Sequence, residues 1–256
     1  MIDALINDPK WFFEFALYRI PAVLIALVFH EWAHGYVAYR LGDPTAKQMG
    51  RLSLNPLKHL DPVGTLMMFF LGFGWAKPVP INPTYFKNPH RDDLLVSIAG
   101  IVMNLLLFLL FTILTVVLNQ FLWHPQVFEA NSLHDLLGFK DGVINYILAG
   151  YGNEFSSFFA RPGFLWAVRL TSQIAMVNMY IAIFNLIPIP PLDGSHLVND
   201  LFFKGKLFVS QQTARIGFAV MMVLSFTGIL GKVMGFLGDG LQAGVLSIIS
   251  AVMRIF

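Results

Sequence analysis

The sequence predicts an all-α, polytopic membrane protein with four to five transmembrane helices. Hydrophobic residues make up 56% of its 256 residues and charged residues only 12%, which is about half the charged share of a soluble domain. Mean hydropathy is +0.66. The apolar residues gather in stretches of about twenty, long enough as helices to cross the hydrocarbon core of a bilayer.

Four stretches are predicted to span the bilayer, within a single membrane-embedded domain covering residues 1–256. These spans lie at about 17–40, 93–118, 164–188 and 214–231. A fifth apolar stretch at 235–253 contains Asp239 and several glycines. The sequence therefore leaves open whether this stretch spans the bilayer or lies in its interface.

The segment 66–83 is predicted to form a re-entrant or hairpin element. Its apolar part is too short to cross a bilayer, and its second part contains three prolines within ten residues. Prolines do not fit inside a continuous sheet, so this part is predicted to be an extended edge strand or hairpin. An exposed edge can pair with the backbone of an extended peptide.

The first span contains the motif H-E-x-x-H, as His30-Glu31-Trp32-Ala33-His34. Histidines four residues apart share one helix face, where they can occupy two positions of a tetrahedral zinc ion. Glu31 is then placed to take a proton from a zinc-bound water. Ionisable groups at mid-membrane are costly, which favours a functional role. The alternative is a pair of histidines that hydrogen-bond inside a helical bundle.

Asp193 is the candidate third ligand. The chain has no cysteine, so any metal must be held by His, Asp or Glu. Asp193 follows three prolines that break the third span, and Gly194 permits a tight turn directly after it. A plain turn is the alternative interpretation of this pattern.

Two asparagines are candidate substrate contacts. Asn104 lies within the second span and Asn185 lies at the end of the third. Either amide could bond a freed peptide backbone or the developing oxyanion. For Asn104, an interhelical hydrogen bond explains the residue equally well.

The distribution of basic residues sets the predicted topology. Seven Lys/Arg lie between Arg40 and Arg91 inclusive, whereas 119–163 has two bases against four acids. The positive-inside rule places 41–92 in the cytoplasm, and brings the end of the first span and Asp193 to the same side. The net charge of +2 is too small to indicate binding to nucleic acid.

Together these motifs resemble the site-2 protease family of intramembrane zinc metalloproteases, in its compact form without a PDZ domain. The matching segments are His30–His34, Gly74–Pro83, Gly100–Asn104 and Asn185–Gly194. The family's glycine-proline before the asparagine appears here as Gly100-Ile101.

The resemblance implies a zinc endopeptidase that cuts transmembrane or signal-like helices of membrane proteins in regulated intramembrane proteolysis. It implies one Zn²⁺ per chain held by His30, His34 and Asp193, with Glu31 as catalytic base and Asn104 and Asn185 handling substrate. We expect a multi-pass protein of the cell membrane, in contact with lipid, whose active site faces the cytoplasm. The sequence sets no oligomeric state.

The alternative is a non-hydrolytic membrane protein that binds or transports metal through the same three ligands. A transporter would need further polar ligands along a path through the membrane, and the remaining spans offer few. His59 and His196 could approach the site, although supporting or purely structural roles are more typical of such histidines.

Overall fold

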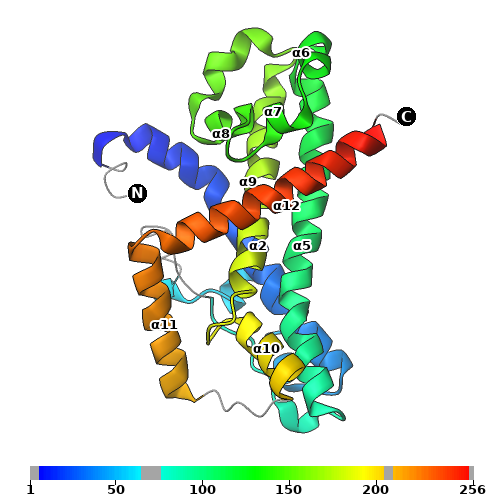
Figure 1. Cartoon of the computed structure of the whole chain (residues 1–256), viewed down its shortest axis with the longest axis vertical. Coiled ribbons are helices and arrows are strands. Elements are labelled where there is room, and N and C mark those ends of the chain that lie inside the picture. Colours follow the sequence, from blue (N-terminus) through cyan, green and yellow to red (C-terminus); the bar gives the residue numbers. More distant parts are fainter. Residues whose placement is uncertain (1–5, 65–75, 205–209, 254–256) are drawn as a thin grey trace. The chain divides into compact units, whose positions relative to one another are not determined.

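The structure is a computed structural model that describes residues 6–64, 76–204 and 210–253. It is 78% helical, and the described residues contain no strand. Within these ranges, four helices are long and apolar enough to cross a membrane, which confirms the predicted fold class (Figure 1). They are α2 (Pro9–Arg40), α5 (Pro89–Leu122), α9 (Leu165–Asn185) and α12 (Ile229–Met253).

The fourth membrane-length helix is α12, which contains the stretch that the sequence left ambiguous. The predicted span 214–231 is corrected to the shorter helix α11 (Gln211–Phe226), which has 16 residues. Sixteen helical residues rise about 24 Å, less than the roughly 30 Å of a hydrocarbon core. Gly228, with φ +74°, lies between the two helices in a conformation that favours glycine.

The first span also differs from its predicted bounds. Helix α2 starts at Pro9 and carries Pro21 in its interior, so it has 32 residues. A proline inside a transmembrane helix is tolerated, since neighbouring groups can satisfy the freed carbonyl. The motif residues His30 to His34 therefore lie in the second half of a long continuous helix.

The chain forms two compact units, one comprising Met1–Val23, Leu106–Met179 and Phe236–Phe256, the other Leu24–Leu105 and Tyr180–Gly235. The prediction of a single domain for 1–256 stays a prediction. All candidate site residues lie in the second unit.

The first unit has its own apolar core, built where short helices follow α5. These are α6 (Pro125–Ala130), α7 (Leu133–Leu137), α8 (Val143–Leu148) and the 3₁₀ helices Tyr151–Phe158 and Pro162–Phe164. Trp123 is buried in this core and donates a 2.7 Å hydrogen bond to Asn119. From α12, Gln242 bonds the backbone of Leu137 and Phe139. These contacts explain why 119–163, although mixed in composition, folds as a series of short helices within that unit.

The second unit surrounds the motif half of α2 with short elements. They are α3 (Thr45–Gln48), the 3₁₀ helices Pro56–Lys58 and Pro83–Tyr85, the first half of α5, the end of α9, α10 (Asp193–Phe203) and α11. Ala38, Phe86 and Val96 form a small buried cluster that joins α2 to α5.

Part of the predicted re-entrant element, 65–75, lies outside the described residues, so its course there stays a prediction. Of the predicted edge strand, Ala76 pairs with Leu60 in a single antiparallel bridge. Residues 77–82 continue as irregular backbone. Because Pro78 and Pro80 have no N–H, a regular ladder cannot extend along this segment.

Candidate metal centre

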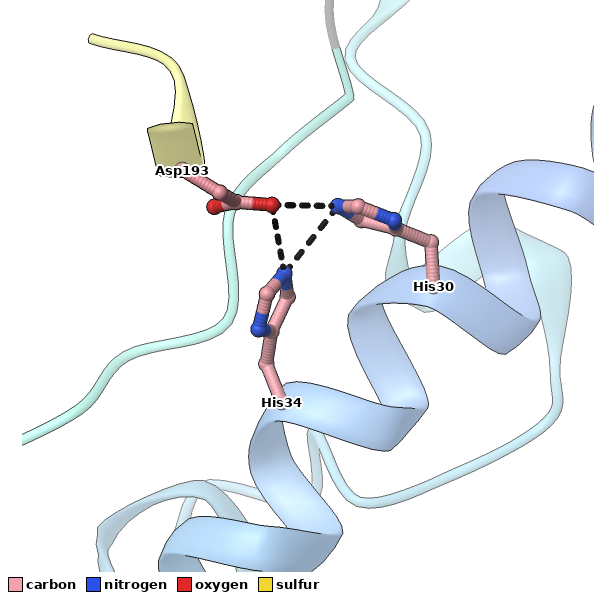
Figure 2. A group of neighbouring side chains, drawn as sticks. All are labelled: His30, His34 and Asp193. Carbon is pink, nitrogen blue, oxygen red and sulfur yellow. Dashed lines mark hydrogen bonds and ion pairs between the residues drawn. The ribbon is translucent and has the colours of Figure 1, made fainter. Parts of the chain in front are cut away.

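His30, His34 and Asp193 meet at one point, although the aspartate lies 159 positions after His34 in the sequence. The two Nε2 atoms lie 3.0 Å apart, and Asp193 Oδ2 lies 3.2 Å from that of His30 and 3.3 Å from that of His34. Figure 2 shows the histidines pointing from α2 toward the carboxylate at the start of α10. Among the described residues, they form the one group of three or more that could hold a metal ion.

These distances fit a zinc ion. Ligand atoms 2.0 to 2.1 Å from one tetrahedral zinc lie about 3.3 Å from one another. The observed separations of 3.0 to 3.3 Å are close to that value. Three protein ligands leave the fourth position open, as in catalytic rather than structural zinc sites.

The outer nitrogens of both rings are held by α5. His30 Nδ1 lies 2.6 Å from Asn104 Oδ1, and His34 Nδ1 lies 2.7 Å from the carbonyl oxygen of Val96. Both oxygens accept, so each Nδ1 carries the proton and each Nε2 presents a lone pair. Three electron-pair donors, the third from Asp193, therefore face one another, and a shared cation would relieve their repulsion.

The two histidines are buried, at 5% and 7% exposed, and Asp193 is half-buried. Metal ligands bind as neutral imidazoles and ionised carboxylates, and a cation bound here would favour those forms of all three residues.

Gly100 allows α5 to approach the two imidazoles. A Cβ at this position would lie 2.4 Å from His34 Nε2 and 2.5 Å from His30 Cε1. Contacts under 3.0 Å are essentially never seen for real Cβ atoms. The sequence marks Gly100 only as a point of comparison with a family motif, and only the packing gives its role.

Two further glycines fit tightly around the turn that presents Asp193. A Cβ at Gly194 would lie 2.4 Å from the carbonyl oxygen of Leu186, and one at Gly217 of α11 would lie 1.8 Å from that of Pro190. The predicted tight turn after Asp193 is not present, because α10 begins at Asp193, and Gly194 instead permits a close approach of backbone to backbone.

Glu31 is half-buried beside the histidines on α2. Its Oε2 accepts a 2.8 Å hydrogen bond from the backbone N–H of Val79. Among the described residues, no other hydrogen bond reaches this carboxylate, so its second oxygen has no hydrogen-bond partner there. The partner at Val79 gave no signal in the sequence, because any residue except proline carries a backbone N–H.

Both predicted asparagines are engaged within the protein. Asn104 is fully buried, and besides its bond to His30 it donates through Nδ2 to the carbonyl of Ala26 at 3.1 Å. The interhelical hydrogen bond that the sequence offered is therefore present. Asn185 donates to the carbonyl of Ile181 one helical turn earlier. Substrate contact by either residue stays a prediction.

The other two histidines considered do not join the metal group. His59 is fully buried, with Nε2 2.6 Å from the carbonyl oxygen of Ser53. His196 Nδ1 lies 3.5 Å from Asp93 Oδ2, which ties α10 to the first turns of α5. His59 therefore holds the backbone of its own loop, and His196 links two helices through its side chain.

A membrane-length helix that carries two buried histidines and an adjacent glutamate, with an aspartate facing the histidines from a second helix, defines a class, the membrane-embedded zinc metalloproteases. The family model for peptidase family M50, the site-2 protease family, matches residues 18–228, and the chain belongs to this family.

Similar proteins agree with this assignment. The chain is 34% identical over 237 residues to "Putative zinc metalloprotease YwhC" of Bacillus subtilis, covering 93% of each chain. It is 26% identical over 214 residues to "Putative zinc metalloprotease Rip2" of Mycolicibacterium smegmatis, covering 82% of this chain and 66% of the relative. The Rip2 protein of Mycobacterium tuberculosis is 28% identical over 176 residues, 67% of this chain and 52% of the relative. No solved structure matches.

The family and the relatives confirm the predicted enzyme class. The chain is a zinc metalloprotease of the membrane, and its cofactor is Zn²⁺. The alternative of a non-hydrolytic metal carrier has no comparable support.

Proposed function

We propose that this zinc metalloprotease is an endopeptidase that hydrolyses peptide bonds within or next to transmembrane segments of other membrane proteins. One observation carries the proposal. The two histidines and the glutamate lie on α2, a helix of 32 residues that is long and apolar enough to span a bilayer. A catalytic group placed on such a helix meets substrate at membrane depth.

In this proposal His30, His34 and Asp193 hold the zinc ion, and Glu31 is the general base. When bound, zinc supplies Lewis acidity, which lowers the pKa of a water to about 7 and polarises a carbonyl. Glu31 takes the proton of the attacking water and returns it to the leaving amine. The hydrogen bond from Val79 to Oε2 leaves Oε1 for these transfers.

A substrate helix must unwind before its peptide bond is attacked, because its carbonyls are otherwise bonded within the helix. Asn185, half-buried at the end of α9, is proposed to bond the freed backbone. Asn104 is proposed to act there too, at the cost of its present bonds to His30 and Ala26.

The basic residues of 41–92 support a cytoplasmic location for the active site, in a protein of the cell membrane. The chain has no native cysteine, so single-cysteine variants test this topology directly. Lys58→Cys in whole cells should resist a membrane-impermeant maleimide, whereas His134→Cys in the oppositely placed loop should react. The reverse labelling pattern would contradict the topology.

The central test combines zinc content with cleavage in the purified full chain. His34→Ala and Asp193→Ala should lose zinc and activity together. Glu31→Gln should keep zinc and lose about 10²- to 10⁴-fold in rate, the usual contribution of a general base. His134→Ala, an exposed histidine in the other unit, is the matched control and should keep both.

The substrate in this test is a fusion protein with one transmembrane helix, reconstituted with the enzyme in liposomes, and mass spectrometry locates the cut. A cut within or beside the helix supports the proposal. Cleavage of unstructured soluble peptides alone, or full activity of Glu31→Gln, would refute the substrate class or the base, respectively.

A further inference from the structure

The extended segment 76–82 holds the carboxylate of Glu31 through a single amide. Val79 N–H donates to Glu31 Oε2 at 2.8 Å, across 48 residues of sequence. Pro78 and Pro80 flank Val79 and have no N–H. Val79 therefore supplies the only amide hydrogen available at this point of the segment.

The other side of the same peptide group is bound by Arg51. One guanidinium nitrogen of Arg51 donates to the carbonyl oxygens of Lys77 at 2.7 Å and Pro78 at 3.1 Å. The carbonyl of Pro78 and the N–H of Val79 belong to one planar peptide unit. This unit is thus bonded at its oxygen by a cation and at its hydrogen by a carboxylate, which fixes its orientation.

The positive charge of Arg51 is buried and is stabilised by these hydrogen bonds to carbonyl oxygens. Arg51 is 8% exposed and its Nε has no hydrogen-bond partner. Among the described residues, no carboxylate lies within 4.0 Å of its guanidinium nitrogens. Burying a cation without a counter-charge is costly. The Pro78–Val79 peptide links Arg51 to Glu31, and hydrogen bonds in a chain polarise one another.

We propose that Arg51 is a positioning residue for Glu31, acting through the Pro78–Val79 peptide group. This inference rests on the proposed role of Glu31 as general base. The guanidinium locks the peptide plane, and the Val79 N–H then holds Oε2 in one place. A carboxylate held at one oxygen presents the other in a fixed direction, and misplacement of about 1 Å can cost 10²-fold in rate.

The rest of the segment supports the same geometry. Lys77 N–H donates to the carbonyl of His59 at 2.8 Å, and Asn82 N–H donates to Asp43 Oδ2 at 2.7 Å. Asp43 is fully buried. These anchors lie on both sides of Val79, so the peptide group cannot easily turn away from Glu31.

Two substitutions of Val79 distinguish the contribution of its backbone amide from that of its side chain. Val79→Pro removes the N–H and keeps three side-chain carbons, whereas Val79→Ala keeps the N–H and removes two methyl groups. Val79→Pro should lower kcat by about tenfold or more, with KM changed less than twofold and zinc retained. Val79→Ala should lower kcat much less than Val79→Pro does. Equal kcat values for the two variants would overturn the inference.

A second pair tests the arginine. Arg51→Gln should lower kcat about as much as Val79→Pro, and Arg51→Lys should recover part of this loss because it keeps a cationic donor. Lys58→Gln removes a positive charge from an exposed residue seven positions further along the chain and is the matched control, with unchanged kcat. A parental kcat in Arg51→Gln would refute the positioning role.

An amide resonance gives a readout independent of cleavage. In ¹⁵N-valine-labelled protein, the Val79 amide proton should move upfield in both Glu31→Gln and Arg51→Gln, because each change weakens the bond to Oε2. A resonance that moves in neither variant would contradict the link.

The two proposals fail in different ways. If Glu31→Gln cleaves at the parental rate, the general-base role is wrong. If Glu31→Gln is inactive while Arg51→Gln and Val79→Pro keep the parental kcat, only the positioning inference is wrong.

Discussion

Replacing Gly100 by alanine should disable the metal centre without touching a ligand. Helix α5 passes so close to α2 that the new Cβ would lie 2.4 Å from His34 Nε2, 2.5 Å from His30 Cε1 and 2.7 Å from His30 Nδ1. One methyl group would thus press on both histidines, including a proposed zinc-binding nitrogen.

The required movement can be worked out from these distances. An ordinary carbon contact begins near 3.4 Å, so the rings or α5 must separate by about 1 Å at the closest point. The rings cannot swing away freely, because each Nδ1 is bonded to α5 through Asn104 or Val96. Zinc sites tolerate deviations of about 0.2 Å in ligand distance. We therefore expect zinc affinity to fall by about 100-fold or more.

The assay is zinc content after purification, with affinity measured by competition against a chelator. Gly240→Ala on α12 is the matched control, because its Cβ would meet nothing within 4 Å. Both substitutions raise intrinsic helix propensity by about 1 kcal/mol. Overpacking at Gly100 costs about 1–3 kcal/mol, so circular dichroism and gel filtration must confirm that this variant folds.

The reasoning would be refuted by a folded Gly100→Ala protein that binds zinc with parental affinity. Such a result would mean that α5 is not held at this distance from the histidines. Loss of zinc in Gly240→Ala as well would show that the effect is not local.

Two further predictions concern the surroundings of the site. Asn104→Ala should weaken zinc binding about 10- to 100-fold, because loss of the hydrogen bond to His30 Nδ1 frees a metal-binding imidazole. The same change at the exposed Asn131 is the control and should leave zinc affinity unchanged. Equal zinc affinities of Asn104→Ala and the parent would contradict this prediction. Burial and the neighbouring Asp93 raise the pKa of Asp200 to about 6. Between about pH 4 and pH 6 this carboxyl is then protonated in the folded state but ionised in the unfolded state, so the free energy of unfolding falls as pH rises over this range. Melting temperatures should therefore rise in Asp200→Asn relative to the parent as pH increases over this range, and a constant difference would contradict the assignment.

Much of the metal centre could be predicted from the sequence, because its chemistry is local. His30, Glu31 and His34 lie within five residues on one helix, and helical periodicity alone places the histidines on one face. The absence of cysteine narrowed the third ligand to few residue types. Composition fixed the all-α membrane class, since stretches of this hydropathy are stable as spanning helices.

The prediction was weaker where helix ends depend on context. The span 214–231 was misplaced because apolar residues run on through Gly228, where the backbone turns and α11 gives way to α12. A hydropathy profile does not detect the turn at Gly228, because it counts only apolar and polar side chains. The same limit applies to α2, whose start at Pro9 precedes the predicted bound.

The sequence by itself determined the residue types of the candidate site, the helix that carries His30, Glu31 and His34, and the class of enzyme. Only the tertiary structure decided which groups hold those residues in place. Gly100, the carbonyl of Val96 and the amide of Val79 act through close approach and backbone hydrogen bonds. Nearly every residue has a backbone N–H and C=O, so the sequence does not show which of them will make these contacts. Only the packing of distant segments determines the partners.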